Sequence, residues 1–518
     1  MKHRSLAGAV RVSLHMICLA LSACTLLPTS RLTITGRVIA AGDQTPVPQS
    51  LVSLRASDFQ TISEEDGSFT LRIPDQLGDF EITAWAPGYY IASEVIAEPQ
   101  TDLTLTLRPH HRSDQAGYTW IDPTADSSEN ACGNCHPMIL PQWGGNAHGQ
   151  AISNRRFYSF YNGTDVSGRA LDAPGYLKDF PGTSGNCATC HAPGVGVDAA
   201  FATEMDTIRG LVTAGIHCDF CHKVGGVYLD PGDDQVYANV PGVLSMQLLR
   251  PPEGEQIFIG PYPDIHDPDT YHPVFSQSAF CAPCHSFSFW GTEIYNSYGE
   301  WLASDYAAQG ITCQACHMPP SGETTFALPE QGGLEHPPER IPSHFQLGVS
   351  DLDFMGSTVV LDVAHEVAAG TLRLEVELTN ATAGHHVPTD HPGRHLILRV
   401  SALNVDGEPL PLKQGTSLPA WIGDLSGEPG EVFAKVLKNA RTGAYPVVDY
   451  WNPTLIHSDT RIPANESHSS VYEFELGDEQ VTIQIQVLFR RLFQPIAEKY
   501  LWDITDVILA EETITLQP

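Results

Sequence analysis

The pattern Cys-x-x-Cys-His occurs five times in this chain of 518 residues, and no other feature constrains its fold as strongly. Two thiols separated by two residues can reach the two vinyl groups of one porphyrin, and the following His then lies under the iron as its proximal ligand. The sequence therefore predicts five covalently bound c-type haems. The thioether cysteines are Cys132, Cys135, Cys187, Cys190, Cys218, Cys221, Cys281, Cys284, Cys313 and Cys316, and the proximal histidines are His136, His191, His222, His285 and His317.

Structural zinc also uses Cys-x-x-Cys pairs, so one such pair would leave the choice of metal open. Here His follows every pair at the same offset. The remaining two of the 12 cysteines, Cys18 and Cys24, lie near the N-terminus, so the motifs leave no cysteine over in the rest of the chain. This pattern favours haem over zinc.

Residues 1–24 are predicted to form a lipoprotein-type signal peptide. A basic start is followed by a short apolar run that ends at Leu21-Ser-Ala-Cys24, which resembles a bacterial lipoprotein box. Cys24 is then the acylated first residue of the mature protein, and Thr25 behind it resembles outer-membrane sorting. An ordinary secretory signal that contains Cys is the alternative. Both versions predict export, and the first predicts an outer-membrane lipoprotein that faces the periplasm or the cell surface.

The charge of the chain argues against nucleic acid as a partner. There are 61 acidic and 28 basic residues, which gives a net charge of −33. A solubility role is the simplest interpretation of this charge, and steering of cationic partners is the alternative. The only membrane contact that we expect is the lipid anchor.

Strand-like alternation over residues 32–109, as at Leu103, Leu105 and Leu107, predicts a small antiparallel β-sandwich. This segment resembles the carboxypeptidase regulatory-like, transthyretin-type domain. The motifs that carry the resemblance are Gly36-Arg37-Val38, Val52-Ser53-Leu54, Asp66-Gly67-Ser68-Phe69 and Ala86-Pro87-Gly88-Tyr89.

The remaining chain divides into two further parts, which makes the predicted fold multidomain. Residues 110–348 are rich in Gly, Pro, Asn and Asp and have little aliphatic periodicity, so we expect a loop-rich, mainly α segment whose core is the haems. Residues 352–518 return to strand alternation and predict a C-terminal β-sandwich. Within it, Asp459-Thr-Arg461 is expected to form a structural ion pair or turn.

The surroundings of the motifs resemble the hydroxylamine oxidoreductase superfamily of multihaem cytochromes over roughly residues 115–390. That superfamily includes tetrahaem electron carriers, pentahaem nitrite reductases and filament-forming cytochromes. The resemblance is carried by Cys132-Gly-Asn-Cys-His136 followed by Trp143 and His148, by Gly215-Ile-His-Cys-Asp-Phe-Cys-His-Lys223, and by Glu300-Trp301 leading to Gly310-Ile-Thr-Cys-Gln-Ala-Cys-His-Met-Pro319.

The resemblance also implies distal iron ligands on the second face of each haem. The candidates are His148, His272, His344 and His385, and the weaker candidates are His386, His266, His217, His110 and His111. Short intervals between the second and third motifs, and between the fourth and fifth, predict two close haem pairs. The fifth distal ligand stays open: it comes from these histidines or from a neighbouring subunit, or one haem is five-coordinate.

Closely packed haems predict electron transfer in the periplasm or outside the cell, with redox proteins such as other cytochromes as partners. One alternative is an oxidoreductase that acts on nitrite, hydroxylamine or nitric oxide at a five-coordinate haem. Pentahaem nitrite reductases typically have Lys in place of one motif His, whereas all five motifs here end in His, so a carrier is favoured. The other alternative is a homo-oligomeric, filament-forming electron conduit.

Overall fold

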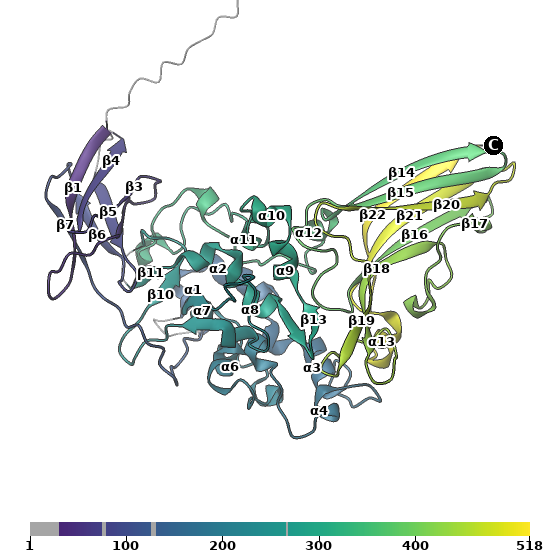
Figure 1. Ribbon diagram of the computed structural model, residues 1–518, viewed down its shortest axis with the longest axis horizontal. Coiled ribbons are helices and arrows are strands. Elements are labelled where there is room, and N and C mark those ends of the chain that lie inside the picture. The colour runs from purple at the N-terminus through teal and green to yellow at the C-terminus, as the bar shows by residue number, and fades with distance from the viewer. Residues whose placement is uncertain (1–30, 75–78, 126–130, 266–267, 518) are drawn as a thin grey trace, which may run out of the picture.

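The computed structural model describes residues 31–74, 79–125, 131–265 and 268–517, and it arranges them in three parts along the long axis of the molecule (Figure 1). β-Sheets stand at both ends, and a segment of loops and short helices lies between them. The expected multidomain fold with several β-sheets and some helices is confirmed. Within the described residues, no helix has the length and hydrophobicity needed to cross a bilayer.

The N-terminal part contains two sheets. One has the order β4-β1-β7 and the other β3-β2-β5-β6, and side chains such as Val38 and Ile82 bury their surface in one shared core. β7 shows the alternating burial that its Leu-Thr repeat predicts. The sequence predicts antiparallel pairing throughout, but β1 pairs with β7 in parallel. The strands are β1 (Arg31–Ala40), β2 (Leu51–Leu54), β3 (Gln60–Ile62), β4 (Ser68–Pro74), β5 (Phe80–Trp85), β6 (Ala92–Ile96) and β7 (Leu103–Leu107).

The N-terminal part is fixed to the middle segment by polar and apolar contacts. The indole nitrogen of Trp85 donates to Thr270 Oγ1 at 3.0 Å, and the hydroxyl of Tyr90 donates to the carbonyl of Gln256 at 2.8 Å. Tyr90 also packs against Ile257 and Ile259 in a small buried cluster. These contacts place the first sheet pair beside β10 (Phe258–Gly260) and β11 (Asp269–Tyr271).

The middle segment has no long element. Its longest helix, α3, has 8 residues, and two-stranded sheets account for its strands. The aliphatic side chains form only small buried clusters there, as expected for a segment whose interior is built around large bound groups. The α-helices are α1 (Cys132–Cys135), α2 (Ile139–Gly145), α3 (Arg155–Asn162), α4 (Tyr176–Asp179), α5 (Ala188–His191), α6 (Pro193–Ala199), α7 (Cys218–Cys221), α8 (Ala282–His285), α9 (Ser297–Leu302), α10 (Asp305–Ala308) and α11 (Cys313–His317); the remaining strands are β8 (Val224–Val227), β9 (Met246–Leu248), β12 (Phe287–Phe289) and β13 (Thr292–Tyr295).

The C-terminal part consists mainly of long strands, several of them 10 residues long. One sheet has the order β14-β15-β20-β17 and the other β19-β18-β16-β21-β22, and residues from both, such as Leu374 and Ile485, form the largest core cluster. The elements are α12 (Leu352–Gly356), β14 (Val359–Ala368), β15 (Thr371–Asn380), β16 (His395–Leu403), β17 (Leu412–Gln414), β18 (Gly430–Asn439), β19 (Thr454–Asp459), β20 (Ser467–Glu475), β21 (Val481–Arg490), α13 (Gln494–Lys499) and β22 (Val507–Leu516). The loop between β15 and β16, residues 381–394, turns back toward the middle segment.

Candidate haem-binding site

Each Cys-x-x-Cys-His motif forms about one helical turn, on α1, α5, α7, α8 and α11. Residues three apart lie on the same face of a helix, so both thiols of a motif can face one planar group. The five motifs define haem sites 1 to 5, numbered in their order along the chain.

Most motif histidines are held through the same ring nitrogen. Nδ1 of His136, His222 and His317 lies 2.8, 2.8 and 2.6 Å from the backbone carbonyls of Phe326, Ile259 and Leu347, respectively. Nδ1 of His285 instead lies 3.0 Å from the carboxylate of Asp390. An Nδ1–H that donates to such an acceptor leaves Nε2 free to bind a metal, and it fixes the orientation of the ring.

Four of the five sites line one continuous cavity of about 2280 Å³. The motif residues of sites 1, 3, 4 and 5 contribute to its wall, together with aromatic side chains such as Trp143, Phe275 and Trp301. The motif residues of site 2 are not among the described residues that line it. A large apolar cavity lined by pairs of cysteines and by the motif histidines fits haem c, which supplies one-electron chemistry at its iron when bound.

Contacts between the thiols show which sites are adjacent. The side chains of Cys132 and Cys218 are within hydrogen-bonding reach, so sites 1 and 3 adjoin. Cys190 contacts Cys284 in the same way, which joins sites 2 and 4.

Sites 4 and 5 adjoin through Cys281 and Cys313, as the short sequence interval predicts. The expected pairing of sites 2 and 3 is not the one these thiol contacts show, since site 2 contacts site 4 and site 3 contacts site 1. The chain folds back between motifs, so distance along the sequence does not fix proximity in space.

Each of two pairs of histidines has the spacing of two axial ligands of a single iron. The ring centres of His148 and His285 are 6.2 Å apart, and those of His317 and His385 are 6.3 Å apart. Two imidazoles bound to opposite sides of one metal through bonds of about 2 Å place their ring centres about 6 Å apart. Nδ1 of His385 lies 2.9 Å from the carbonyl of His386, which leaves its Nε2 available as well.

His344 lies close to sites 1 and 3. Burial, with smaller contributions from the neighbouring His222 and His136, lowers its pKa to about 4, so the imidazole is neutral at pH 7 and able to bind a metal. Burial likewise lowers the pKa of His148 to about 4, with a contribution from His285.

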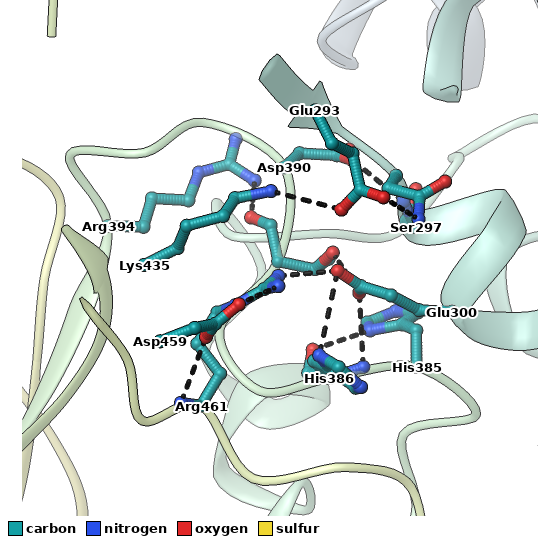
Figure 2. A network of polar contacts seen from close by, with 12 residues as sticks. Glu293, Ser297, Glu300, His385, His386, Asp390, Arg394, Lys435, Asp459 and Arg461 are labelled. Atoms are coloured by element: carbon teal, nitrogen blue, oxygen red, sulfur yellow. Dashed lines mark hydrogen bonds and ion pairs between the residues drawn. The ribbon is translucent and has the colours of Figure 1, made fainter. Parts of the chain in front are cut away.

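The loop 381–394 is held by a buried polar network (Figure 2). Glu300 on α9 accepts hydrogen bonds from Arg461 Nη1 and Thr389 Oγ1, each at 2.5 Å, and from the backbone N–H of His386 at 3.2 Å. Arg461 also binds both carboxylate oxygens of Asp459, at 2.8 and 2.7 Å. The expected Asp459–Arg461 ion pair is thus confirmed, and it is part of the contact between the C-terminal sheets and the haem segment.

The comparisons with known proteins agree with this geometry. Residues 131–223 match the sequence model of a family described as cytochrome c554 and c-prime. The fold is similar to the crystal structure of a penta-heme cytochrome c552 from Thermochromatium tepidum, with 19% sequence identity and a TM-score of 0.56 over 75% of this chain and 99% of that chain. These findings support a multihaem c-type cytochrome.

No curated protein matches the chain. A cohesin–X–dockerin complex from Acetivibrio cellulolyticus covers 14% of this chain and 51% of its own, with 12% identity and a TM-score of 0.13, which is too low to inform the fold.

The weaker distal candidates in this chain make other contacts. His217 is fully buried and caps α7: its Nδ1 accepts from the N–H of Phe220 at 3.3 Å, and its Nε2 lies 3.1 Å from the carbonyl of Thr213. Both ring nitrogens are therefore used. Nδ1 of His386 lies 3.7 Å from Glu300 Oε1, which is beyond hydrogen-bonding distance, and it has no hydrogen-bond partner within the described residues.

His272 presents its Nδ1 to the N–H of Val274 at 3.2 Å, which favours the tautomer that carries its proton on Nε2. His110 Nδ1 lies 2.5 Å from the carbonyl of its neighbour His111, whose own Nε2 lies 3.1 Å from the carbonyl of Leu249. His266 and Cys24 fall outside the described residues.

Sequence reasoning missed Asp390, which reaches site 4 from the C-terminal part. It lies 105 positions from His285, and no motif links the two residues. Its one local signal is conformational: φ is 61° at Asp390, a left-handed backbone conformation that Asp tolerates better than most residues. The carbonyls of Phe326, Ile259 and Leu347 carry no side-chain signal and could not be found from the sequence.

Proposed function

We propose that the chain is an exported pentahaem c-type cytochrome that carries electrons through closely spaced haems to redox proteins such as other cytochromes. The observation that carries this proposal is the pair of histidine couples, His148 with His285 and His317 with His385, at the spacing of two axial ligands. An iron with imidazole on both faces has no open position and exchanges electrons without binding substrate.

The remaining parts of the proposal rest on sequence. Five haems follow from the five motifs, membership of the hydroxylamine oxidoreductase superfamily from their surroundings, and an outer-membrane lipid anchor from Cys24. The N-terminal sheet pair is proposed to be a carboxypeptidase regulatory-like sandwich over residues 32–109. The haem segment then spans 110–348 and the C-terminal sandwich 352–518.

The test combines spectroscopy with one substitution. Mass spectrometry of the purified protein is expected to show five covalent haems, and paramagnetic resonance is expected to show low-spin iron at the sites with two histidines. His148→Met should change the potential of one haem without loss of covalent haem, because it replaces only a distal ligand.

His217→Gln is the matched control, because both nitrogens of His217 are bound to the backbone; it should leave every potential unchanged. Unmodified thiols, or zinc in place of iron, would refute the proposal. An unaltered titration for His148→Met would refute that ligand assignment alone.

A second candidate function is reduction or oxidation of a small nitrogen compound at site 2. His191 stacks on Phe157 with ring centres 4.3 Å apart, and among the described residues no histidine stands opposite it at the spacing of the other two pairs. Cys190 is close to Tyr295, and Tyr450 donates or accepts a 3.3 Å hydrogen bond with Tyr295. A high-spin haem signal that changes on addition of nitrite, hydroxylamine or nitric oxide would favour this function over a pure carrier.

A further inference from the structure

Haem site 4 differs from the other sites in the partner of its proximal histidine. Among the described residues, His285 is the motif histidine whose Nδ1 faces a carboxylate, at 3.0 Å from Asp390 Oδ2. The motif histidines of sites 1, 3 and 5 face neutral backbone carbonyls. An anionic acceptor pulls the Nδ1 proton more strongly than a carbonyl does and makes the imidazole a stronger electron donor to its metal.

The fold holds Asp390 in this position from several directions. The residue is 8% exposed, and its other carboxylate oxygen accepts the backbone N–H of Ser297 at 3.3 Å. Arg394 lies near the carboxylate. Thr389 in the same loop donates a hydrogen bond to Glu300, which restricts movement of the Asp390 carboxylate.

Site 4 is also the branch point of the haem arrangement. Cys284 contacts Cys190 of site 2, and Cys281 contacts Cys313 of site 5. Cys221 of site 3 is near enough to Cys284 to interact with it electrostatically, and site 3 contacts site 1. Sites 1 and 3 thus lie on one side of site 4, and sites 2 and 5 on the other. Electrons that pass from one side to the other therefore pass through site 4.

We propose that Asp390 lowers the reduction potential of the haem at site 4, so that this haem, at the branch point, is the last to be reduced. This inference rests on the proposed electron-carrier function. A stronger donor ligand stabilises the ferric iron, which lowers the potential. Electrons then rest on the outer sites and cross the branch point only in transit.

The test is Asp390→Asn, studied in the intact haem-loaded protein by an optical redox titration. The amide keeps the size of the side chain and removes its charge. We expect the component with the lowest potential to become easier to reduce by at least about tenfold in its equilibrium constant, which is about 59 mV for one electron. The other components should stay in place.

The control is Glu293→Gln, which removes one negative charge from the same polar region. Glu293 pairs with Lys435 at 3.7 Å, and the described structure shows it no contact with a haem-site histidine. It should leave the lowest component unchanged. An equal shift in both variants would show a general field effect and refute the proposal. A lowest component that does not move in Asp390→Asn, or a shift confined to another component, would also refute it.

If Asp390→Asn yields no haem-loaded protein, Asp390→Glu serves as the second variant. It keeps the charge but changes the approach to His285, so we expect the lowest component to shift in the same direction by a smaller factor. A titration with no shift would again overturn the inference. Failure of the proposed carrier function gives a different result, because the unmodified protein would then lack haem or could not be reduced.

Discussion

Replacement of Glu300 by Ala tests whether the buried network holds the loop 381–394 against the haem segment. The side chains of Glu300 and Arg461 are each 4% exposed. Removal of the carboxylate leaves three donors without their acceptor: Arg461 Nη1, the hydroxyl of Thr389 and the N–H of His386.

The size of the effect follows from this geometry. Breaking a buried ion pair from one side costs about 3–5 kcal/mol. Asp459 still binds Arg461 through two hydrogen bonds, which reduces the loss from the arginine. The two orphaned neutral donors add about 1–3 kcal/mol each when they stay buried. We therefore expect Glu300→Ala to lower the free energy of unfolding by at least about 3 kcal/mol.

The assay is urea unfolding of the haem-loaded protein, followed by haem absorbance. The matched control is Glu375→Ala, which removes a carboxylate from an ion pair with Arg373 whose side chains are 57% and 37% exposed, respectively. Exposed pairs of this kind contribute less than about 1 kcal/mol. If Glu300→Ala destabilises the protein no more than Glu375→Ala does, the network does not hold the loop.

Two further outcomes are expected. Joint replacement of Cys187 and Cys190 by Ser should leave a protein in which mass spectrometry finds one haem fewer and the other haems keep their ligands. The reason is that the described residues of this motif do not line the large cavity. Loss of several haems would contradict that separation. His395 is buried and its pKa is lowered by burial to about 4, so it stays neutral in the folded state while the unfolded chain takes up a proton below pH about 6.5. The stability that this neutral His395 contributes is therefore present above pH about 6.5 and is lost as the pH falls toward 4. In urea unfolding experiments, the free energy of unfolding of His395→Gln should fall less between pH 7 and pH 5 than that of the unmodified protein.

The sequence was informative where chemistry is local. The strands of both end parts follow from patterns a few residues long, as at Leu103, Leu105 and Leu107. The ion pair of Asp459 and Arg461 is local as well.

Features that join distant parts of the chain were not predictable. The contact of Cys190 with Cys284 and that of Asp390 with His285 depend on how the chain folds back on itself. His217 shows the converse problem, because a histidine beside a motif has the same sequence signal whether it binds iron or caps a helix. Only the direction of its ring nitrogens separates the two roles.

The loop between β15 and β16 has a consequence for how the protein is assembled. It brings His385 to site 5 and Asp390 to site 4, although both residues are synthesised after all five motifs. Arg461, which helps to hold this loop, follows still later. We therefore expect maturation of the last two sites to end only after the C-terminal sheets have formed, and a chain released early to carry attached porphyrins with unfinished coordination.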